Sequence, residues 1–470
     1  MTTSRRQVLG FAAVGTALAV LEGCAPLAHR LEQEDPALPL PPGDTHPALR
    51  LLGRAGFGPR PGDLARVAGM GTEAYLQTQL RADAREDLDL QLQLQRLDVL
   101  QIDDPDLEDL PREVVIAQLQ QAALLRAVHG RNQLLERMAD FWTNHFNVYA
   151  RKGDGSFRKG ADERDVIRRH AVGSFPALLR ASARSPAMLA FLDNTQNLKS
   201  HPNENYAREL MELHSLGIGG GYTQLDVQEV ARCFTGWTIE DRFLRPRGKL
   251  RFDPERHDDG QKLVLGHVIP PGGGERDVDQ VLDILGSHPS TARFIARKLV
   301  RYFYGEEDPK LIDATAERYR DTGGDIPSLI GPLLDPNLLA GAPPVLKRPF
   351  DYIASCVRAT GGYTDGGTPI QAHLVAMGEP LYQWPMPDGY PTKTTSWTGN
   401  MLPRWNFAYA LATGSVGGSG TDLAPGLDAF ETVLGRRPAP RDQATLDLVH
   451  GKPAGEALAL FLASPEFQWC

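Results

Sequence analysis

Hydrophobic and polar positions follow a helical period along most of the chain between Pro47 and His145. Apolar residues recur every three or four positions, the spacing that places them on one side of a helix. The stretches are ALRLLGRAGF, AYLQTQL, LDLQLQLQRLDVL, VVIAQLQQAALLRAVH and LLERMADFWTNHF. The last of them has an apolar stripe made by Leu134, Met138, Phe141, Trp142 and His145. It predicts a helix whose His145 faces inward.

The helical period returns in residues 162–192 and from Val278 to about Thr360. Four shorter helices are expected at 405–413, 426–433, 440–449 and 454–464. Residues 361–405 lack the period and are rich in proline and aromatic residues, which favours a long loop. The predicted fold class is therefore mainly α: a large orthogonal helical bundle with one small β-hairpin and one long aromatic loop.

The predicted hairpin lies in residues 248–267. Two short runs of alternating residues flank Asp259-Gly260, and an Asp-Gly pair between such runs is a strong hairpin signal. The pattern predicts two strands that pair across this turn and place His257 and Asp258 at its tip. Both side chains are candidates for function, and exposure to water is the simpler interpretation.

Residues 201–237, which we call the central unit, combine two helix starts with a glycine-rich break. Asn203 is a good N-cap for a first helix, and Gly217 is a good terminator for it. Thr223 and Asp226 form a capping-box pattern that starts a second helix. The prediction is a helix, a glycine hinge and a second helix that ends near Trp237.

The first helix of the central unit has one apolar side, on which His214 lies. Its other side carries Asn205, Arg208, Glu209 and Glu212. This polar side either faces water or lines a polar cleft in which the two glutamates act as catalytic carboxylates. His145 and His214 are likewise either hydrogen-bonded core histidines or members of a shared site.

Side chains with amide or carboxylate oxygens gather near the first helix of the central unit. They suit a divalent cation or the hydroxyl groups of a sugar, and they equally suit side chains that cap their own backbone. The catalytic candidates are Glu209, Glu212, His145, His214 and His257, with a divalent metal as an open option for the cofactor. The candidate ligand-binding residues are Asn144, Asp193, Asn194, Asn197, Asn203, Asn205, Arg208, Asp226, Trp237, Asp258, Trp384 and Trp397.

Trp384 and Trp397 belong to the proline-rich and aromatic stretch. The high content of aromatic residues in this stretch fits two interpretations. The aromatic side chains form either a platform for sugar rings or a clamp packed over the helical bundle.

Several long motifs resemble the bacterial family known as domain of unknown function 1800. They are PNENYARELMELHSLG, YTQLDVQEVARCFTGW, FWTNHF, LDNTQN, HDDGQKLVLG and HPSTARFIARKL. The likeness extends over about residues 46–465 and implies a single helical domain at 46–470. It brings no established reaction or catalytic residues. It implies an exported partner similar to sulfatases.

The N-terminus predicts export. Arg5 and Arg6 precede an uncharged run from Val8 to Leu21, which resembles a twin-arginine signal over residues 1–23. Cys24 resembles the lipidated cysteine of a lipoprotein, and the alternative is cleavage at a small residue such as Ala25. Residues 24–45 then form a tether. We expect a periplasmic protein held to the membrane by an N-terminal lipid anchor.

The net charge of -9 and the lack of a basic cluster argue against a nucleic-acid partner. The sequence leaves two hypotheses for the function. The first is an envelope hydrolase that acts on an extracytoplasmic polymer, such as a polysaccharide, through a carboxylate and histidine site with or without a metal. The second is a non-catalytic binding or assembly protein of the envelope that works with the sulfatase-like partner.

Overall fold

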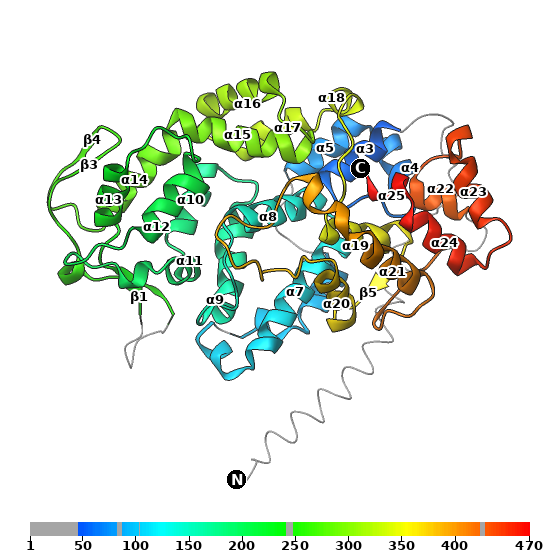
Figure 1. The fold of residues 1–470 in the computed structure, drawn as a ribbon, viewed down its shortest axis with the longest axis horizontal. Helices are drawn as coiled ribbons and strands as arrows, with labels where there is room; N and C mark the ends of the chain where they lie inside the picture. The colour runs from blue at the N-terminus through cyan, green and yellow to red at the C-terminus, as the bar shows by residue number, and fades with distance from the viewer. Residues whose placement is uncertain (1–45, 82–86, 103, 241–247, 424–427) are drawn as a thin grey trace, which may run out of the picture.

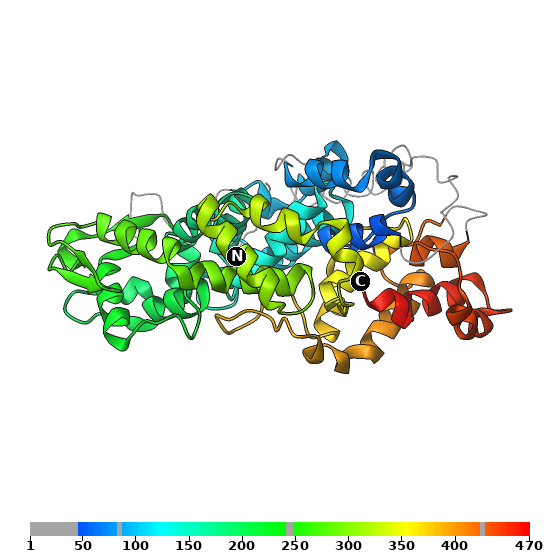
Figure 2. The same cartoon turned by 90° about the horizontal axis from the view of Figure 1, so that it is seen from above.

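The computed structural model describes residues 46–81, 87–102, 104–240, 248–423 and 428–470, and these residues are mainly helical. The prediction of a mainly α fold is confirmed. The molecule is elongated, with the strands between residues 237 and 269 at one end and the last helices at the other (Figures 1 and 2). Across the described ranges, no helix is both long and apolar enough to cross a membrane. Arg5, Arg6 and Cys24 lie outside the described residues.

The first helices surround the middle of the molecule. They are α3 (Pro47–Ala55), α4 (Asp63–Met70), α5 (Thr72–Leu80), α6 (Leu88–Leu94), α7 (Arg112–His129) and α8 (Gln133–His145), with the 3-10 turns η1 (Asp98–Leu100) and η2 (Asp104–Asp109). In α8 the predicted apolar stripe is buried, and His145 is buried with it. Glu136 and Arg137 of α8 are buried as well. The charged side of this helix therefore also faces protein.

The next segment ends with the central unit. Its elements are α9 (Gly155–Ala161), η3 (Asp162–Arg168), α10 (Phe175–Ala183), α11 (Pro186–Phe191), η4 (Asn194–Gln196), α12 (Glu204–Glu209), η5 (Leu210–Ser215) and α13 (Gln224–Cys233). The predicted caps are confirmed, because Asn203 accepts from the Asn205 amide and Thr223 forms a capping box with Asp226. The first helix continues as the π-helical turn η5.

Within the described ranges, six short strands form three antiparallel pairs. β1 (Trp237–Ile239) pairs with β2 (Leu250–Phe252), β3 (Lys262–Val264) pairs with β4 (His267–Ile269), and β5 (Tyr363–Thr364) pairs with β6 (Ser419–Gly420). The 3-10 turn η6 (Pro254–Arg256) follows β2. The predicted hairpin is wrong, because β2 and β3 on either side of Asp259-Gly260 pair with other strands. Trp237 likewise starts a strand and does not end the second helix.

Buried side-chain contacts explain the different strand pairing. His257 is only 3% exposed, and its Nδ1 lies 2.8 Å from the Thr235 carbonyl. Arg232 holds Asp258 at 2.7 Å, and the buried Lys262 ammonium binds Asp277. These contacts draw the segment into the core, so His257 does not lie at an exposed tip. A local turn signal cannot compete with so many long-range bonds.

The described residues after β4 are mainly helical. Their helices are α14 (Arg276–Ser287), α15 (Pro289–Phe303), α16 (Pro309–Thr322), α17 (Ile326–Leu333), α18 (Pro336–Ala340), α19 (Pro349–Ala359), α20 (Thr368–Ala376), η7 (Thr394–Ser396), η8 (Thr398–Asn400), α21 (Met401–Ala412), α22 (Ala429–Leu434), η9 (Pro440–Asp442), α23 (Gln443–Val449), α24 (Ala454–Ala463) and α25 (Pro465–Gln468). The expected loop at 361–405 is therefore wrong in part, because it contains α20 and the start of α21. The apolar residues of α20 itself lie on several of its faces, so the sequence shows no helical period there.

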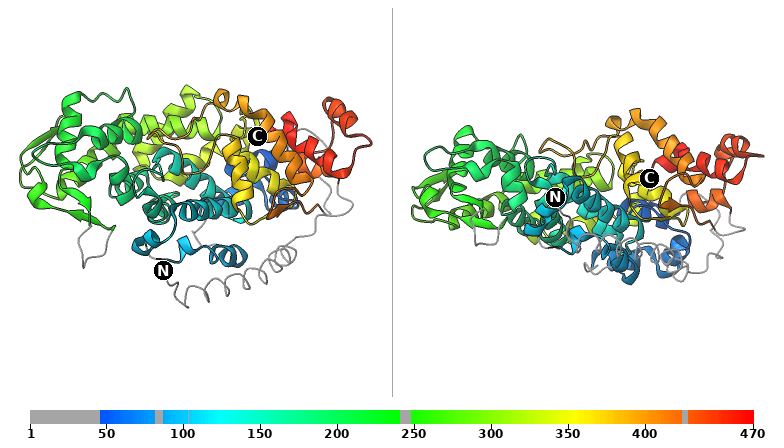
Figure 3. Two further views of the ribbon diagram at one scale, coloured as in Figure 1. Left: turned by 60° about the horizontal axis from the view of Figure 1, so that its bottom comes forward. Right: turned by 90° about the horizontal axis from the view of Figure 1, so that it is seen from below.

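Two large apolar cores meet near α7 and α8. The first joins α3 to α5, α8 and the helices from α10 to α18, and the second joins the end of α7 to α19 and the C-terminal helices. A small third core lies between α6 and α7. The views of Figure 3 show the C-terminal helices at the end opposite the central unit. Between α20 and α21, residues 380–400 cross toward α8, and we call them the aromatic segment (Figure 1).

Candidate functional site

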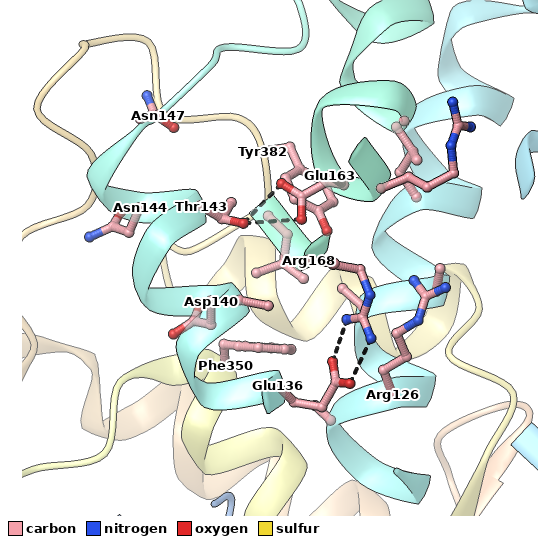
Figure 4. Close-up of a pocket in the computed structure, with 18 of the residues that line it drawn as sticks. Arg126, Glu136, Asp140, Thr143, Asn144, Asn147, Glu163, Arg168, Phe350 and Tyr382 are labelled. Carbon is pink, nitrogen blue, oxygen red and sulfur yellow. Dashed lines mark hydrogen bonds and ion pairs between the residues drawn. The ribbon is translucent and has the colours of Figure 1, made fainter. Parts of the chain in front are cut away.

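A cavity of about 500 Å³ lies beside α8. Its walls come from α7, α8, η3, the start of α19 and the aromatic segment (Figure 4). The apolar part of the lining includes Phe57, Leu119, Ala122, Phe350 and Leu381. The polar part includes Arg126, Glu136, Asp140, Thr143, Asn144, Asn147, Glu163, Arg164, Arg168, Arg169, Arg348 and Glu379. An apolar pocket with convergent polar groups is the usual form of a small-molecule site.

Four arginines line the cavity from α7 and the end of η3. Arg168 binds both oxygens of Glu136 at 2.7 and 2.8 Å, and Arg126 lies next to this pair in Figure 4. Arg164 pairs with its neighbour Asp165 at 2.8 Å. Arg169 is exposed and makes no ion pair with any residue that the structure describes. This side of the cavity therefore offers positive charge to an anionic group.

Glu163, also on η3, is held by two donors. Thr143 donates to it at 2.9 Å and the ammonium of Lys159 lies 2.7 Å away. Lys159 is fully buried and also pairs with Asp162 at 2.8 Å. Burial alone would lower the pKa of Lys159, but the two carboxylates raise it above its ordinary value. The ammonium is therefore charged and fixes the geometry of η3.

At the other end of the cavity, two guanidinium groups share three buried carboxylates. Arg348 contacts Asp140, lies 3.1 Å from Glu379 and 3.7 Å from Asp351. Arg137 donates to Asp351 at 2.5 Å. We call these five residues the Arg348 cluster. If all five were charged the cluster would carry one excess negative charge, which is costly in a dry interior.

Glu379 reduces this excess, because its burial favours the protonated carboxyl. It is 1% exposed, and burial raises its pKa to about 7. The charge of Arg348 opposes the rise, while Asp140 and Asp351 add to it. Its Oε2 accepts from the Phe350 amide at 2.9 Å, which fixes the carboxyl against the cavity wall. A carboxyl with a pKa near neutrality can serve as a general acid or base.

Asn144 and Asn147 fasten the aromatic segment to α8. Asn144 donates to the Tyr390 carbonyl at 3.0 Å and accepts from its amide at 2.6 Å. Asn147 donates to the Trp384 and Met386 carbonyls at 2.9 and 2.6 Å. A Cβ at Gly389 would lie 2.1 Å from the Asn144 carbonyl, so only glycine allows this approach. Both amides therefore shape the cavity through the backbone that they hold.

His145 and His214 come together behind α8, with ring centroids 6.1 Å apart. The His145 Nε2 atom lies 3.2 Å from the His214 carbonyl and its Nδ1 lies 2.7 Å from the Lys298 ammonium. Neither ring nitrogen of His214 has a partner among the described residues. Burial lowers the pKa of His145 well below its usual range and that of His214 to about 3, with Lys298 adding to both. Both rings are neutral at pH 7.

The side-chain amides in and just before the central unit bind backbone groups. Asn194 donates to the Trp237 carbonyl at 3.1 Å, and Asn197 donates to the Ala231 carbonyl at 2.8 Å. The Asn203 amide donates to Asn197 at 2.9 Å, and Asn205 donates to the Leu192 carbonyl at 3.1 Å. These bonds match the interpretation in which the side chains cap the local backbone.

The acidic candidates of this region have separate surroundings. Asp193 accepts from Lys152 at 2.8 Å, and Asp226 accepts from the Leu265 amide at 2.7 Å besides its capping role. Arg208 binds Glu204 and Gln224, at 3.1 and 2.9 Å.

Glu209 and Glu212 are half-buried. Burial and then the charge of Glu212 raise the pKa of Glu209, and Tyr222 donates to Glu212 at 3.2 Å. Glu209 makes no hydrogen bond or ion pair within the described ranges. The structure does not bring these two carboxylates to His145 or His214, which lie on the buried side.

The tryptophan candidates differ in exposure. Trp237 is buried and stacks under Arg184, whose guanidinium lies 5.7 Å from its ring. Trp397 is 5% exposed, packs with Leu346 and Tyr390, and donates to the Pro391 carbonyl at 2.9 Å. Trp384 is half-exposed and donates to Asp388 at 2.9 Å. Trp397 has the packing of a clamp, and Trp384 keeps a face open to solvent.

The described residues contain no group of three or more histidine, cysteine or acidic side chains that could hold a metal ion.

The comparison with known proteins places the chain in a family. The model for proteins of unknown function (DUF1800) matches residues 50–469. The chain belongs to the DUF1800 family. No curated protein and no solved structure matches it. For this DUF1800 protein, function must therefore be argued from the cavity and the groups beside it.

Sequence reasoning on this DUF1800 protein missed the residues that dominate the cavity. They are Arg126, Glu136, Asp140, Glu163, Arg168, Arg348 and Glu379. One signal was available: Glu136 and Asp140 are one helical turn apart on α8, next to the apolar stripe. Charged residues inside such a tightly packed helix need partners. Arg348 and Glu379 lie more than 200 residues away, so the sequence could not supply their contacts.

Proposed function

We propose that the protein is an envelope protein that binds an acidic, sugar-sized unit of an extracytoplasmic polymer in the cavity beside α8. The observation that carries the proposal is the combination of aromatic side chains, such as Phe350 and Tyr382, with five arginines around a space of about 500 Å³. Aromatic faces suit the apolar faces of a sugar ring, and guanidinium groups suit carboxylate or sulfate.

The free positive charge of the cavity supports an anionic ligand. Arg168 is already neutralised by Glu136, whereas Arg169 is exposed and has no ion-pair partner in the described structure. A carboxylate or sulfate near Arg169 would gain a charge-assisted hydrogen bond. A neutral sugar would gain only the stacking contribution.

Calorimetric titration with acidic and neutral oligosaccharides tests this proposal. We expect acidic oligosaccharides to bind at least about tenfold more tightly, a difference of about 1.4 kcal/mol. Arg169→Ala should remove most of that preference, and Arg320→Ala on the exposed face of α16 is the matched control. Equal binding of neutral and acidic ligands, or an unchanged preference in Arg169→Ala, would contradict the proposal.

Hydrolysis of the bound unit is a second candidate function, favoured by the pKa of about 7 at Glu379 in the cavity wall. A protonated Glu379 would donate to the leaving oxygen of a glycosidic bond. Glu379→Gln should then abolish the release of reducing ends while binding is retained. Release at an unchanged rate in Glu379→Gln would rule out this role.

Export and the lipid anchor belong to the same proposal, supported by Arg5, Arg6 and Cys24. Replacing both arginines by lysine should leave the precursor in the cytoplasm, and Cys24→Ala should release the protein from the membrane fraction. A sulfatase-like exported partner, which the family resemblance implies, would act on a sulfated form of such a polymer.

A further inference from the structure

Lys298 on α15 lies in a small second pocket, separate from the cavity but bordered by two of the same residues, Asn144 and Arg348. The pocket has a volume of about 60 Å³, and its walls include Phe141, Tyr302, Leu346 and Trp397. This space holds about four water-sized groups. Its walls are mainly apolar, and the lysine amine and an imidazole nitrogen lie together in it.

The hydrogen bonds of His145 determine its tautomer. The His214 carbonyl can only accept, so the His145 Nε2 atom, 3.2 Å away, must carry the ring proton. Nδ1 is then a free acceptor, and it lies 2.7 Å from the Lys298 Nζ atom. The imidazole is therefore a fixed hydrogen-bond acceptor directed at the amine.

The groups around Lys298 provide little negative charge. Arg301 on the same helix repels it, and the exposed Asp388 of the aromatic segment attracts it weakly. His145 from α8 and His214 from η5 are neutral, while Arg137, Arg348 and Asp351 line the pocket as members of the Arg348 cluster. Burial, with Arg301, lowers the pKa of Lys298 to about 8. A desolvated lysine of this kind is the usual form of a nucleophilic amine.

We propose that Lys298 is a nucleophile that forms a Schiff base with a small aldehyde or ketone, and that His145 transfers the proton. The neutral amine form of Lys298 adds to the carbonyl carbon, which gives an alkoxide and a secondary ammonium, and one ammonium proton passes by way of the His145 Nδ1 atom to the alkoxide oxygen. Loss of one water from this carbinolamine leaves the C=N bond. No oxidant or reductant is consumed.

Reductive trapping on the full-length protein tests the proposal. Glycolaldehyde, which has four non-hydrogen atoms, is added with cyanoborohydride, and modified lysines are counted by peptide mass spectrometry. At pH 7 we expect Lys298 to react at least about tenfold faster than the exposed Lys310. Its rate should be half-maximal near pH 8, and Lys298→Met should remove the modified peptide.

Two comparisons make the result specific. Lys347 also has a pKa lowered by burial, but its ammonium lies over the Phe467 ring without a histidine, so it should react slowly. His145→Gln should slow the Lys298 reaction, and an unchanged rate would remove His145 from the step. If that variant does not fold, the pH dependence of the Lys298 modification rate in the unaltered protein decides. A pH dependence like that of an ordinary lysine, or a rate equal to that of Lys310, overturns the proposal.

Discussion

The central unit and the cavity use their polar side chains in opposite ways. Directly before the central unit, Asn194 and Asn197 are buried, and their amides bind the backbone carbonyls of Trp237 and Ala231 within it. In the cavity, Arg348 is shared by three carboxylates, and Glu379 keeps a pKa of about 7. A polar group satisfied by backbone fixes the fold, whereas an incompletely balanced charge can respond to a ligand or to pH.

The largest expected difference between the two regions concerns their arginines. Arg348→Met would leave Asp140 and Glu379 buried without their cation, so we expect a loss of about 3–5 kcal/mol in the free energy of unfolding. Arg208→Met in the central unit removes a partly exposed pair with Glu204 and should cost less than about 1 kcal/mol. Denaturant unfolding of both variants at pH 7 measures this. Equal losses would contradict the contrast.

The second expected effect is a dependence of stability on pH. The folded pKa of Glu379 is about 7, above its ordinary value of 4.5. A raised carboxyl pKa gives stability that is complete below pH 4.5 and lost as pH rises through 7. The loss is about 3 kcal/mol, since each pKa unit corresponds to about 1.4 kcal/mol. Glu379→Gln should flatten the unfolding free energy between pH 4.5 and 8, and a profile that keeps its slope would contradict this origin.

The sequence predicted the parts of the fold that depend on local rules. The caps at Asn203 and Thr223 and the inward stripe of α8 need only residues within a few positions of each other. The predicted pairing of β2 with β3 is wrong because Lys262 binds Asp277 and Arg232 binds Asp258. A turn signal gives no information about such distant partners. Helix α20 was missed because its apolar residues are not restricted to one face.

The candidate site shows the same limit. His145 and His214 were recognised on apolar faces, and the structure brings them together, but Lys298 between their helices was not among the candidates. The carboxylates chosen from the sequence were those on a visible polar face, Glu209 and Glu212. Those that line the cavity, such as Glu136, lie on a helix buried on several sides and look like ordinary surface charges in the sequence.

The third expected effect concerns Asn197, which lies just before the central unit and binds two of its backbone groups. Asn197 donates to the Ala231 carbonyl and accepts from the Asn203 amide, and it is 2% exposed. Asn197→Ala leaves both backbone groups without a partner and should cost about 1–3 kcal/mol. Asn205→Ala is the matched control, because Asn205 is exposed, and it should cost less than about 0.5 kcal/mol. Ligand binding in the cavity should stay unchanged in both, and weaker binding in Asn197→Ala would show that the two regions are coupled.

The smallest expected effect decides whether the central unit holds a site of its own. Glu209 is half-buried and has no hydrogen bond or ion pair in the described structure, and Glu212 repels its charge. Glu209→Gln removes that repulsion, so we expect a change of less than about 0.5 kcal/mol in the free energy of unfolding at pH 7, in the stabilising direction. Glu212→Gln, which keeps a contact with Tyr222, is the paired variant.

Denaturant unfolding at pH 5 and pH 8 checks the sign, because a carboxyl with a raised pKa disfavours the folded state only when it is ionised. A destabilisation above about 1.5 kcal/mol in Glu209→Gln would mean that this carboxylate has a favourable partner in solution. The polar face of the central unit would then return as a binding site, and the contrast with the cavity would no longer hold.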